Sequence, residues 1–226
     1  MSNEYIQHYL GIENTYPSAF ALKCFLGNNP QWSLKRDELL GKTICDIGFG
    51  DGRDLNLFLD LGMEVSGLEP DPEVVKHTLK KFKSMSKTCD LRVGTNIEIP
   101  FGENTFDYVY SSAAIYYLPS AKYTIMDALF EVKRVLKPGG LFFVSFSTDV
   151  NHTVNGANWL DKNRIILEDA FYKFRKGQLY HVYNSTTEVH NDLLEVGIEP
   201  AYIGKYFVDW FGTEESWFIC IGKNLD

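Results

Sequence analysis

From Asp37 onward, short apolar runs alternate with longer stretches in which apolar residues recur every three or four positions. The short runs indicate strands and the longer stretches indicate amphipathic helices, a combination typical of a mostly parallel sheet covered by helices on both faces. The predicted strands are residues 43–47, 64–68, 91–93, 106–111, 141–146, 201–208 and 216–222. The predicted helices are residues 55–61, 72–87, 120–136 and 187–196.

Two regions interrupt this alternation. Residues 1–36 are predicted to be largely helical and to form a cap, and residues 149–185 form a long insertion before the last helix and strand pair at 186–226. Insertions of this length are commonly a lid or a pocket wall, and a packing accessory is the alternative. We expect a single α/β domain with a cofactor-binding core at residues 37–148, the helical cap and a substrate lid.

Composition narrows the classes of function. The 226 residues are 45% hydrophobic, which is enough for one large domain with a substantial core. Because 22 Lys and Arg oppose 30 Asp and Glu, the net charge is −8, and no global positive field exists to hold a nucleic acid. Four scattered cysteines show no metal-binding spacing and fit a reducing compartment.

The chain start has no basic patch followed by an apolar segment, and no apolar run approaches the roughly 20 residues of a membrane span. We therefore expect a cytoplasmic protein with no metal, no membrane partner and no nucleic-acid partner. The sequence gives no indication of the oligomeric state.

The most informative stretch joins the strand at 43–47 to the helix that follows it. Its turn carries Gly48, Gly50 and Gly52, and glycines allow positive φ angles and close approach of a ligand. Free N–H groups at the helix start favour a polar or charged ligand. The dinucleotide fingerprint GxGxxG would need Gly or Ala at position 53, which is Arg53, so that fingerprint fails.

An acidic residue accompanies this turn: Glu69 ends the next strand, where a carboxylate can accept both hydrogen bonds of a ribose diol. The combination resembles the class I S-adenosylmethionine-dependent methyltransferases, and the resemblance extends over residues 38–147. Residues 94–107 are similar to the family's stretch between its third and fourth strands. Residues 134–141, with the sequence RVLKPGGL, are similar to its turn before strand five.

The resemblance implies a Rossmann-like, seven-stranded, mostly parallel sheet that binds S-adenosyl-L-methionine and releases S-adenosyl-L-homocysteine. It implies that Glu69 holds the ribose hydroxyls, that Pro70 and Ile97 enclose the adenine, and that Asp46 lies near the ammonium group. The other residues expected to bind the cofactor are Gly48, Phe49, Gly50, Gly52, Arg53, Thr95, Asn96, Ser111 and Ser112.

Three of these assignments carry qualifications. Arg53 is placed to pair with the methionine carboxylate, or alternatively with Asp51 or Asp54 in a structural ion pair. Thr95 stands where the family often has an aspartate that contacts the adenine amino group, and its hydroxyl can accept the same hydrogen bond. Ser112, with Ser111 before it, is expected to line the place toward which the methyl group points.

Methyl transfer from a sulfonium is an in-line displacement that depends on positioning, and an alcohol acceptor also needs a base. His152 follows strand five on the ligand-binding edge and is the leading candidate, with a solvated loop histidine as the alternative. His8 and His181 could also reach the pocket. Of Tyr116 and Tyr117 after strand four, one is expected in the core and the other in the pocket wall; Tyr117 is assigned as the second catalytic candidate.

The acceptor is indicated only by charge. Residues 151–185 carry five basic and three acidic side chains, a balance of +2, which permits an anionic acceptor; a solvated helix face is the alternative. We therefore expect methyl transfer to an oxygen or nitrogen of a small molecule, such as a phosphorylated or nucleotide-linked sugar. The alternatives are a protein methyltransferase and a non-catalytic cofactor-binding subunit of a complex.

Overall fold

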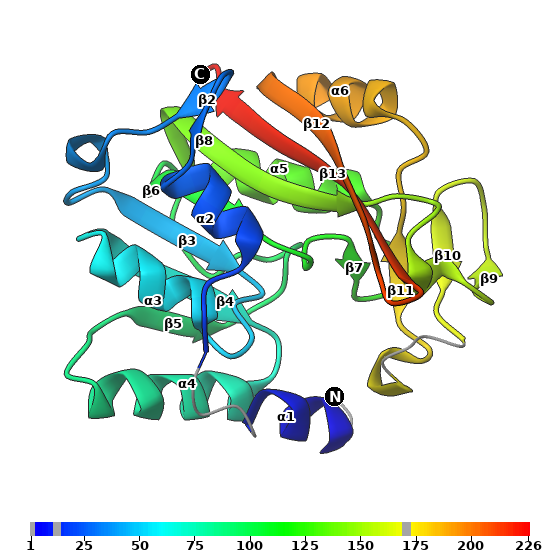
Figure 1. Ribbon diagram of the computed structural model, residues 1–226, viewed down its shortest axis with the longest axis horizontal. Coiled ribbons are helices and arrows are strands. Elements are labelled where there is room, and N and C mark those ends of the chain that lie inside the picture. Colours follow the sequence, from blue (N-terminus) through cyan, green and yellow to red (C-terminus); the bar gives the residue numbers. More distant parts are fainter. Residues whose placement is uncertain (1–2, 11–14, 169–172) are drawn as a thin grey trace.

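The protein is described from a computed structural model, which covers residues 3–10, 15–168 and 173–226. A twisted seven-stranded sheet forms its centre, in the order β12-β13-β8-β6-β3-β4-β5 (Figure 1). The pairs β5–β4, β4–β3, β3–β6 and β6–β8 are parallel, whereas β13 pairs antiparallel with both β8 and β12. The strands are β3 (Thr43–Ile47), β4 (Glu64–Glu69), β5 (Asp90–Val93), β6 (Phe106–Ser111), β8 (Leu136–Ser147), β12 (Ile198–Trp210) and β13 (Thr213–Asn224). The predicted seven-stranded, mostly parallel sheet is therefore confirmed.

Helices cover both faces of this sheet. Strand residues alternate between two hydrophobic clusters: Ile44 packs with α2, α3 and α4 on one face, and the next residue, Cys45, packs with α5 and α6 on the other. The helices are α1 (Asn3–Leu10), α2 (Ala19–Phe25), α3 (Arg53–Asp60), α4 (Pro72–Ser84), α5 (Ile125–Val135) and α6 (Thr186–Glu195).

Capping residues set where the helices begin. Asp71 accepts a hydrogen bond from the Glu73 backbone N–H, with Pro72 at the first helical position of α4. In α5, Thr124 and Asp127 form a reciprocal capping box. This box explains why α5 starts at Ile125, five residues later than the hydrophobic pattern predicts.

The strand order reverses at β3. From β3 the chain adds β4 and β5 on one side and then crosses back to add β6 and β8 on the other. In open α/β sheets, ligands bind outside the carboxyl ends of the strands at such a reversal. The fold therefore directs attention to the ends of β3, β4 and β6.

The insertion contains short strands that the hydrophobic pattern does not predict. It forms a small antiparallel sheet in the order β7-β11-β10-β9, in which one strand precedes α5 in the chain. Its strands are β7 (Tyr117–Leu118), β9 (Asn158–Trp159), β10 (Arg164–Ile166) and β11 (Leu179–His181), with short 3₁₀ helices η2 (His152–Val154) and η3 (Lys173–Arg175). Strands of two or three residues are too short to show a strand period in the sequence.

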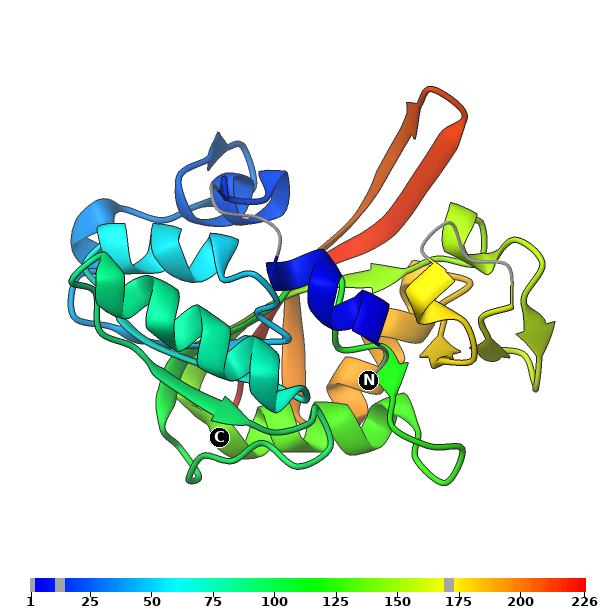
Figure 2. The same cartoon turned by 90° about the horizontal axis from the view of Figure 1, so that it is seen from below.

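The N-terminal cap is also only partly helical. After α2 comes a small hairpin, β1 (Asn28–Asn29) with β2 (Trp32–Ser33), and then the 3₁₀ turn η1 (Arg36–Glu38). Helix α1 contacts both α4 and η3, so it joins the main sheet layer to the insertion (Figure 2). The long β12–β13 hairpin projects from the body beside the insertion.

Candidate functional site

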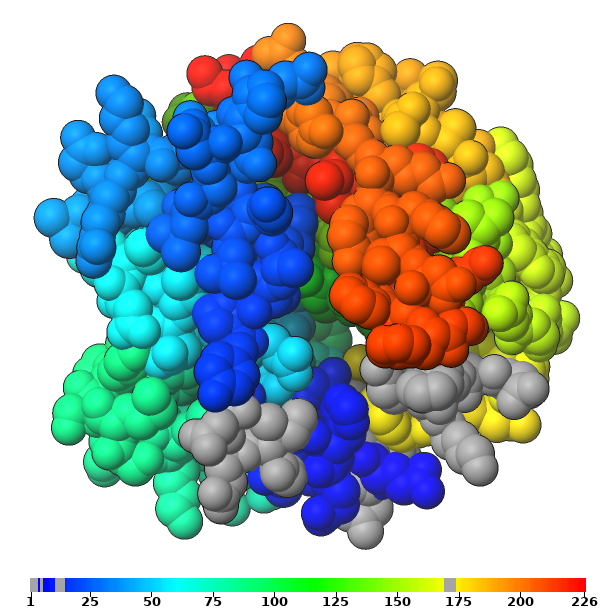
Figure 3. Space-filling view, viewed as in Figure 1, coloured from blue at the N-terminus to red at the C-terminus, as the bar shows by residue number. Residues whose placement is uncertain are grey.

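A cavity of about 1090 Å³ opens at the carboxyl ends of β3, β4 and β6. Its walls come from the N-terminal helices, the loop after β6, the insertion and the β12–β13 hairpin. In the space-filling view, a hollow lies between the N-terminal segment and this hairpin (Figure 3). Because pockets for drug-sized ligands measure about 300–1,000 Å³, this volume is large enough for a cofactor together with a second small molecule.

The glycine turn forms one wall of the cavity. Gly48 (φ 77°) and Gly50 (φ 53°) are left-handed, and the Gly48 N–H donates to the Leu68 carbonyl at 2.8 Å. A Cβ at Gly48 would lie 2.5 Å from Ala114, and one at Gly50 would lie 2.6 Å from the Tyr9 ring. The turn therefore requires glycine at both positions, because a side chain would collide with Ala114 or Tyr9.

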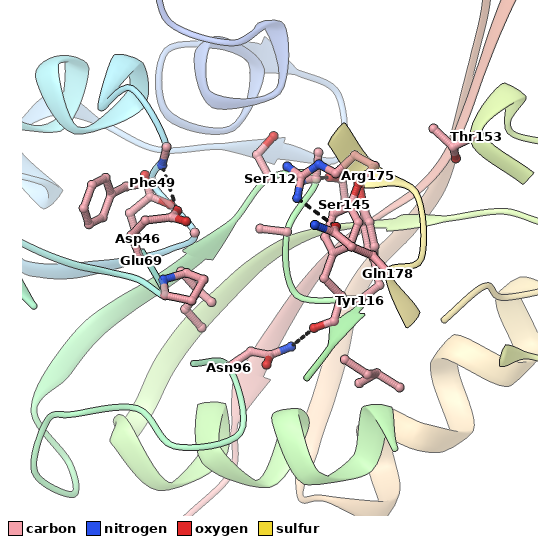
Figure 4. A pocket seen from close by; sticks show the side chains of 18 of the residues that line it. Asp46, Phe49, Glu69, Asn96, Ser112, Tyr116, Ser145, Thr153, Arg175 and Gln178 are labelled. Carbon is pink, nitrogen blue, oxygen red and sulfur yellow. Dashed lines mark hydrogen bonds between the residues drawn. The ribbon is translucent and has the colours of Figure 1, made fainter. Parts of the chain in front are cut away.

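Two buried carboxylates lie beside the turn. Glu69 is 2% exposed and accepts a hydrogen bond from the Gly50 N–H at 3.3 Å (Figure 4). Asp46 is 3% exposed, and its side chain forms no hydrogen bond within the described residues. Burial, followed by the nearby charges of Asp54 and Glu69, raises the pKa of Asp46 well above its usual value. This wall therefore suits a positively charged group or a hydrogen-bond donor.

Arg53 forms an ion pair with Asp51, which the sequence analysis gave as an alternative to pairing with the methionine carboxylate. Its guanidinium contacts both carboxylate oxygens of Asp51, with Nη2 to Oδ2 at 2.6 Å, and this contact raises the pKa of Arg53. The Arg53 side chain still lines the cavity. The bidentate pair holds the start of α3 and orients the guanidinium.

Asn96 lines the cavity and links the segment after β5 to the loop after β6. Its side-chain amide donates to the carbonyls of Ile115 and Tyr117, the latter at 2.9 Å. In the same loop, Ala113 is left-handed (φ 53°), and its N–H donates to Ser145 Oγ at 2.9 Å. A non-glycine residue in this conformation is strained and needs such support. The loop is therefore held at both of its ends.

The cavity brings together ten of the thirteen predicted cofactor residues. They are Asp46, Gly48, Phe49, Gly50, Arg53, Glu69, Pro70, Thr95, Asn96 and Ser112.

The other three, Gly52, Ile97 and Ser111, lie outside the cavity lining. Gly52 packs against the Phe82 ring, which would lie 2.8 Å from a Cβ. Ser111 is fully buried, where its hydroxyl donates to the Ile47 carbonyl and accepts from Ile115 N–H. Ile97 packs against the hydrophobic cluster under α5. These contacts of Gly52, Ser111 and Ile97 are all with other residues of the protein.

Aromatic rings and one guanidinium form the opposite end of the cavity. The Arg175 guanidinium stacks over the Tyr117 ring at 4.3 Å and donates to Tyr9 Oη at 2.9 Å and Gln178 Oε1 at 3.1 Å. Tyr116 is buried in the cavity wall, and its ring contacts the Tyr117 ring. Figure 4 shows Arg175, Gln178 and Tyr116 across the cavity from Asp46 and Glu69.

The three candidate histidines differ in their position relative to the cavity. His152 lines the cavity, and its Nδ1 lies 2.9 Å from the Glu214 carbonyl. A carbonyl only accepts, so Nδ1 carries the proton and Nε2 is the basic nitrogen of the neutral ring. His8 also lines the cavity, and burial and the Arg175 charge lower its pKa. His181 is buried in β11 outside the lining, where burial lowers its pKa to about 4.

Sequence reasoning missed one wall of the cavity. Glu215, Trp217 and Ile219, on one face of β13, line it, and Tyr206 of β12 joins them in register with Trp217. Ser145 at the end of β8 lies beside Ile219. The alternation of Glu215, Trp217 and Ile219 was visible as a strand period, but it did not show which face meets the cavity.

Comparison with known proteins is consistent with this arrangement. A family described as "Methyltransferase domain" matches residues 45–144. A sterol 4-C-methyltransferase of Caenorhabditis elegans is 32% identical over 110 residues, which are 47% of this chain and 32% of that protein. A sterol 24-C-methyltransferase of Pneumocystis carinii is 30% identical over 105 residues, covering 45% and 27%. This chain thus spans about a third of the length of such relatives.

Solved structures share the fold at low sequence identity. A Methanosarcina mazei S-adenosylmethionine-dependent methyltransferase matches with a TM-score of 0.66 and 17% identity, covering 85% of this chain and 94% of that one. The 1,6-didemethyltoxoflavin-N1-methyltransferase of Burkholderia thailandensis, solved with its acceptor and S-adenosylhomocysteine, matches with a TM-score of 0.59 and 18% identity, covering 83% and 72%. Within the described residues, no helix has the length and apolar character of a membrane span.

Proposed function

We propose, from the premise that this chain carries a class I S-adenosylmethionine-dependent methyltransferase domain, that the protein transfers a methyl group from S-adenosyl-L-methionine to an oxygen or nitrogen of a small molecule. One observation carries the proposal. At the strand reversal, a bare glycine turn and the two buried carboxylates Asp46 and Glu69 face a cavity with room for two ligands.

The residues of this wall fit the cofactor in charge and shape. The buried Asp46 carboxylate suits the ammonium group, since burying a carboxylate without a cationic partner is costly. Glu69 can accept both ribose hydroxyls, and its bond from the Gly50 N–H fixes its position. Pro70 and Thr95 line the adjoining part of the cavity, where the adenine would lie.

Catalysis in this site would rest mainly on positioning. The cofactor supplies an activated methyl group on a sulfonium, and no covalent protein intermediate is needed. The loop held by Asn96 and Ser145 gives the acceptor a fixed surface, and the surrounding aromatic rings exclude water. Ser112, the residue directly after β6, lines the cavity.

We assign His152 as the general base for an acceptor that must lose a proton. The Glu214 carbonyl fixes the tautomer in which Nε2 is basic, which is the form a base requires. Tyr117 serves better as a wall, because it lies beneath the Arg175 guanidinium. His152→Gln should lower kcat for an alcohol acceptor with little change in cofactor affinity.

The acceptor class follows from the far end of the cavity. Among the basic residues of the insertion, Arg175 lines the cavity, whereas Lys176 pairs with Glu168. The side chain of Lys173 lies outside the described part of the chain, as does the acidic residue Asp169. Arg175 favours an anionic group and the aromatic walls favour a flat ring. A nucleotide-linked sugar has both an anionic group and a flat ring, so we prefer it to a simple phosphorylated sugar as the acceptor. The Burkholderia structural neighbour, which has 1,6-didemethyltoxoflavin bound, supports a small-molecule acceptor.

Calorimetric titration with S-adenosylmethionine and S-adenosylhomocysteine, with NADH as the control ligand, tests the cofactor. We expect micromolar affinity for the first two and a loss of at least about a hundredfold in Glu69→Ala, because two charged hydrogen bonds disappear. Glu64→Ala, at the exposed opposite end of β4, is the matched control and should bind normally. Absence of binding to either ligand would refute the proposal.

A further inference from the structure

The acceptor end of the cavity has a continuous aromatic floor. The ring of Tyr117 lies 5.2 Å from that of Tyr116, and Tyr116 stacks on Trp217 with centroids 5.7 Å apart and an interplanar angle of 27°. All three residues line the cavity. Such a floor suits an acceptor whose middle is flat or apolar.

Opposite charges mark the two ends of this floor. Arg175 lines the cavity at one end, where its guanidinium stacks over Tyr117 and donates to the neutral side chains of Tyr9 and Gln178. The positive field reaches the cavity, because it contributes to the lowered pKa of His8. A guanidinium presents its donors in a planar fork that matches a carboxylate or phosphate.

At the other end is Glu215. It lies two residues before Trp217 on the same face of β13, about 7 Å along the strand, and it is half-buried in the cavity wall. Its carboxylate forms no hydrogen bond or ion pair within the part of the chain that the structure describes. A carboxylate turned toward a partly dry cavity favours a hydrogen-bond donor or a cation there.

We infer that the acceptor is a bifunctional molecule, with an anionic group at Arg175, a flat or apolar middle on the Tyr117–Tyr116–Trp217 floor, and an ammonium or hydroxyl donor at Glu215. This inference rests on the proposed methyltransferase function and names the acceptor class of the same cavity. Glu215 would then be a specificity-determining residue, since it selects against acceptors that carry anions at both ends.

The test uses three probes of one shape on the full chain saturated with S-adenosylhomocysteine. They are 4′-(aminomethyl)biphenyl-4-carboxylate, which has both charges, biphenyl-4-carboxylate and 4-phenylbenzylamine. We expect the doubly charged probe to bind at least about tenfold more tightly than either singly charged probe, as measured by calorimetry. Glu215→Gln should remove the advantage that the amine gives and leave affinity for biphenyl-4-carboxylate unchanged.

Glu214→Gln is the matched control, because this neighbouring side chain is exposed and lies on the other face of β13. Equal effects of the two substitutions, equal affinity for the three probes, or no binding of any probe to the loaded protein would each overturn the inference. A failure of S-adenosylhomocysteine itself to bind is a separate result, because it would overturn the proposed function and the inference with it.

Discussion

The part of the cavity that we propose binds the cofactor (the cofactor half) and the part that we propose binds the acceptor (the acceptor half) are built in different ways. The cofactor half comes from consecutive strand–turn–helix units between β3 and β8, with buried carboxylates beside bare backbone. The acceptor half is assembled from the loop after β6, which carries Tyr116 and Tyr117, and from α1, the insertion and the β12–β13 hairpin, which lie before and after residues 45–144 in the chain. It is aromatic and carries charges of both signs. The family match therefore covers the cofactor half and leaves most of the acceptor half outside.

This difference explains why relatives inform the two halves unequally. The sterol methyltransferases align with this chain over about 110 residues or fewer, and their alignment covers less than half of it. A shared cofactor half can accompany unrelated acceptor walls, since function depends on the site that a fold carries. The acceptor must be deduced from side chains such as Arg175, Trp217 and Glu215.

The largest expected effect on ligand binding concerns the cofactor half. Asp46→Asn should weaken S-adenosylhomocysteine binding by about a hundredfold, because a charged hydrogen bond to the ammonium is lost. The same substitution should remove a pH dependence of stability. Burial raises the folded-state pKa of Asp46, so the stability it contributes is present at low pH and is lost as pH rises through that raised pKa.

Urea unfolding from pH 4 to pH 8 measures this slope, and calorimetry measures the affinity. The Asn variant should be at least as stable as the parent protein at pH 8. Unchanged affinity would contradict the proposed contact, whereas a lower stability at pH 8 would contradict the cost of the buried charge.

Acid should affect the acceptor half through His181. Its Nε2 is buried without a partner among the described residues, and burial lowers its pKa to about 4 from 6.5. A depressed folded-state pKa gives stability that is present above about pH 6.5 and is lost as pH falls toward 4, in total about 3 kcal/mol. His181→Gln should reduce this loss in urea unfolding, and His190→Gln, on the exposed face of α6, should not.

A smaller effect is expected where the two halves meet. Asn96→Leu removes the donors to the Ile115 and Tyr117 carbonyls, and should lower the free energy of unfolding by about 2 kcal/mol at roughly 1 kcal/mol per bond. Because the loop carries Tyr116 and Tyr117, the acceptor KM should rise more than the cofactor Kd. An equal change in both constants would show that the loop does not act mainly on the acceptor.

The smallest effect belongs to the hairpin tip. Phe211 is 100% exposed and left-handed (φ 55°), a conformation that Asn tolerates better than Phe. Phe211→Asn should raise the free energy of unfolding by up to about 1 kcal/mol without changing cofactor affinity. Phe207→Asn, in the extended part of β12, is the control and should give no gain. Loss of acceptor turnover in Phe211→Asn would extend the acceptor half to the tip.

Sequence reasoning succeeded where structure is local. The strand before Gly48, the turn and the acidic end of β4 are contiguous or one unit apart, so their joint pattern predicts both the fold and a ligand site. It failed where contacts join distant segments. The wall formed by Glu215 depends on the pairing of β13 with β8, about seventy residues earlier in the chain, which no local pattern specifies. The strands of the insertion were not predicted because they contain only two or three residues.

The pairing of β13 with β8 has a further consequence for how the chain can be divided. A fragment that ended with the family match at residue 144 would leave β8 as an open edge, since Trp217–Lys223 of β13 cover its residues 141–147. That edge is rich in phenylalanine, and unpaired apolar edges promote aggregation. We therefore expect the smallest stable folding unit to extend beyond the segment of the family match to the last strand.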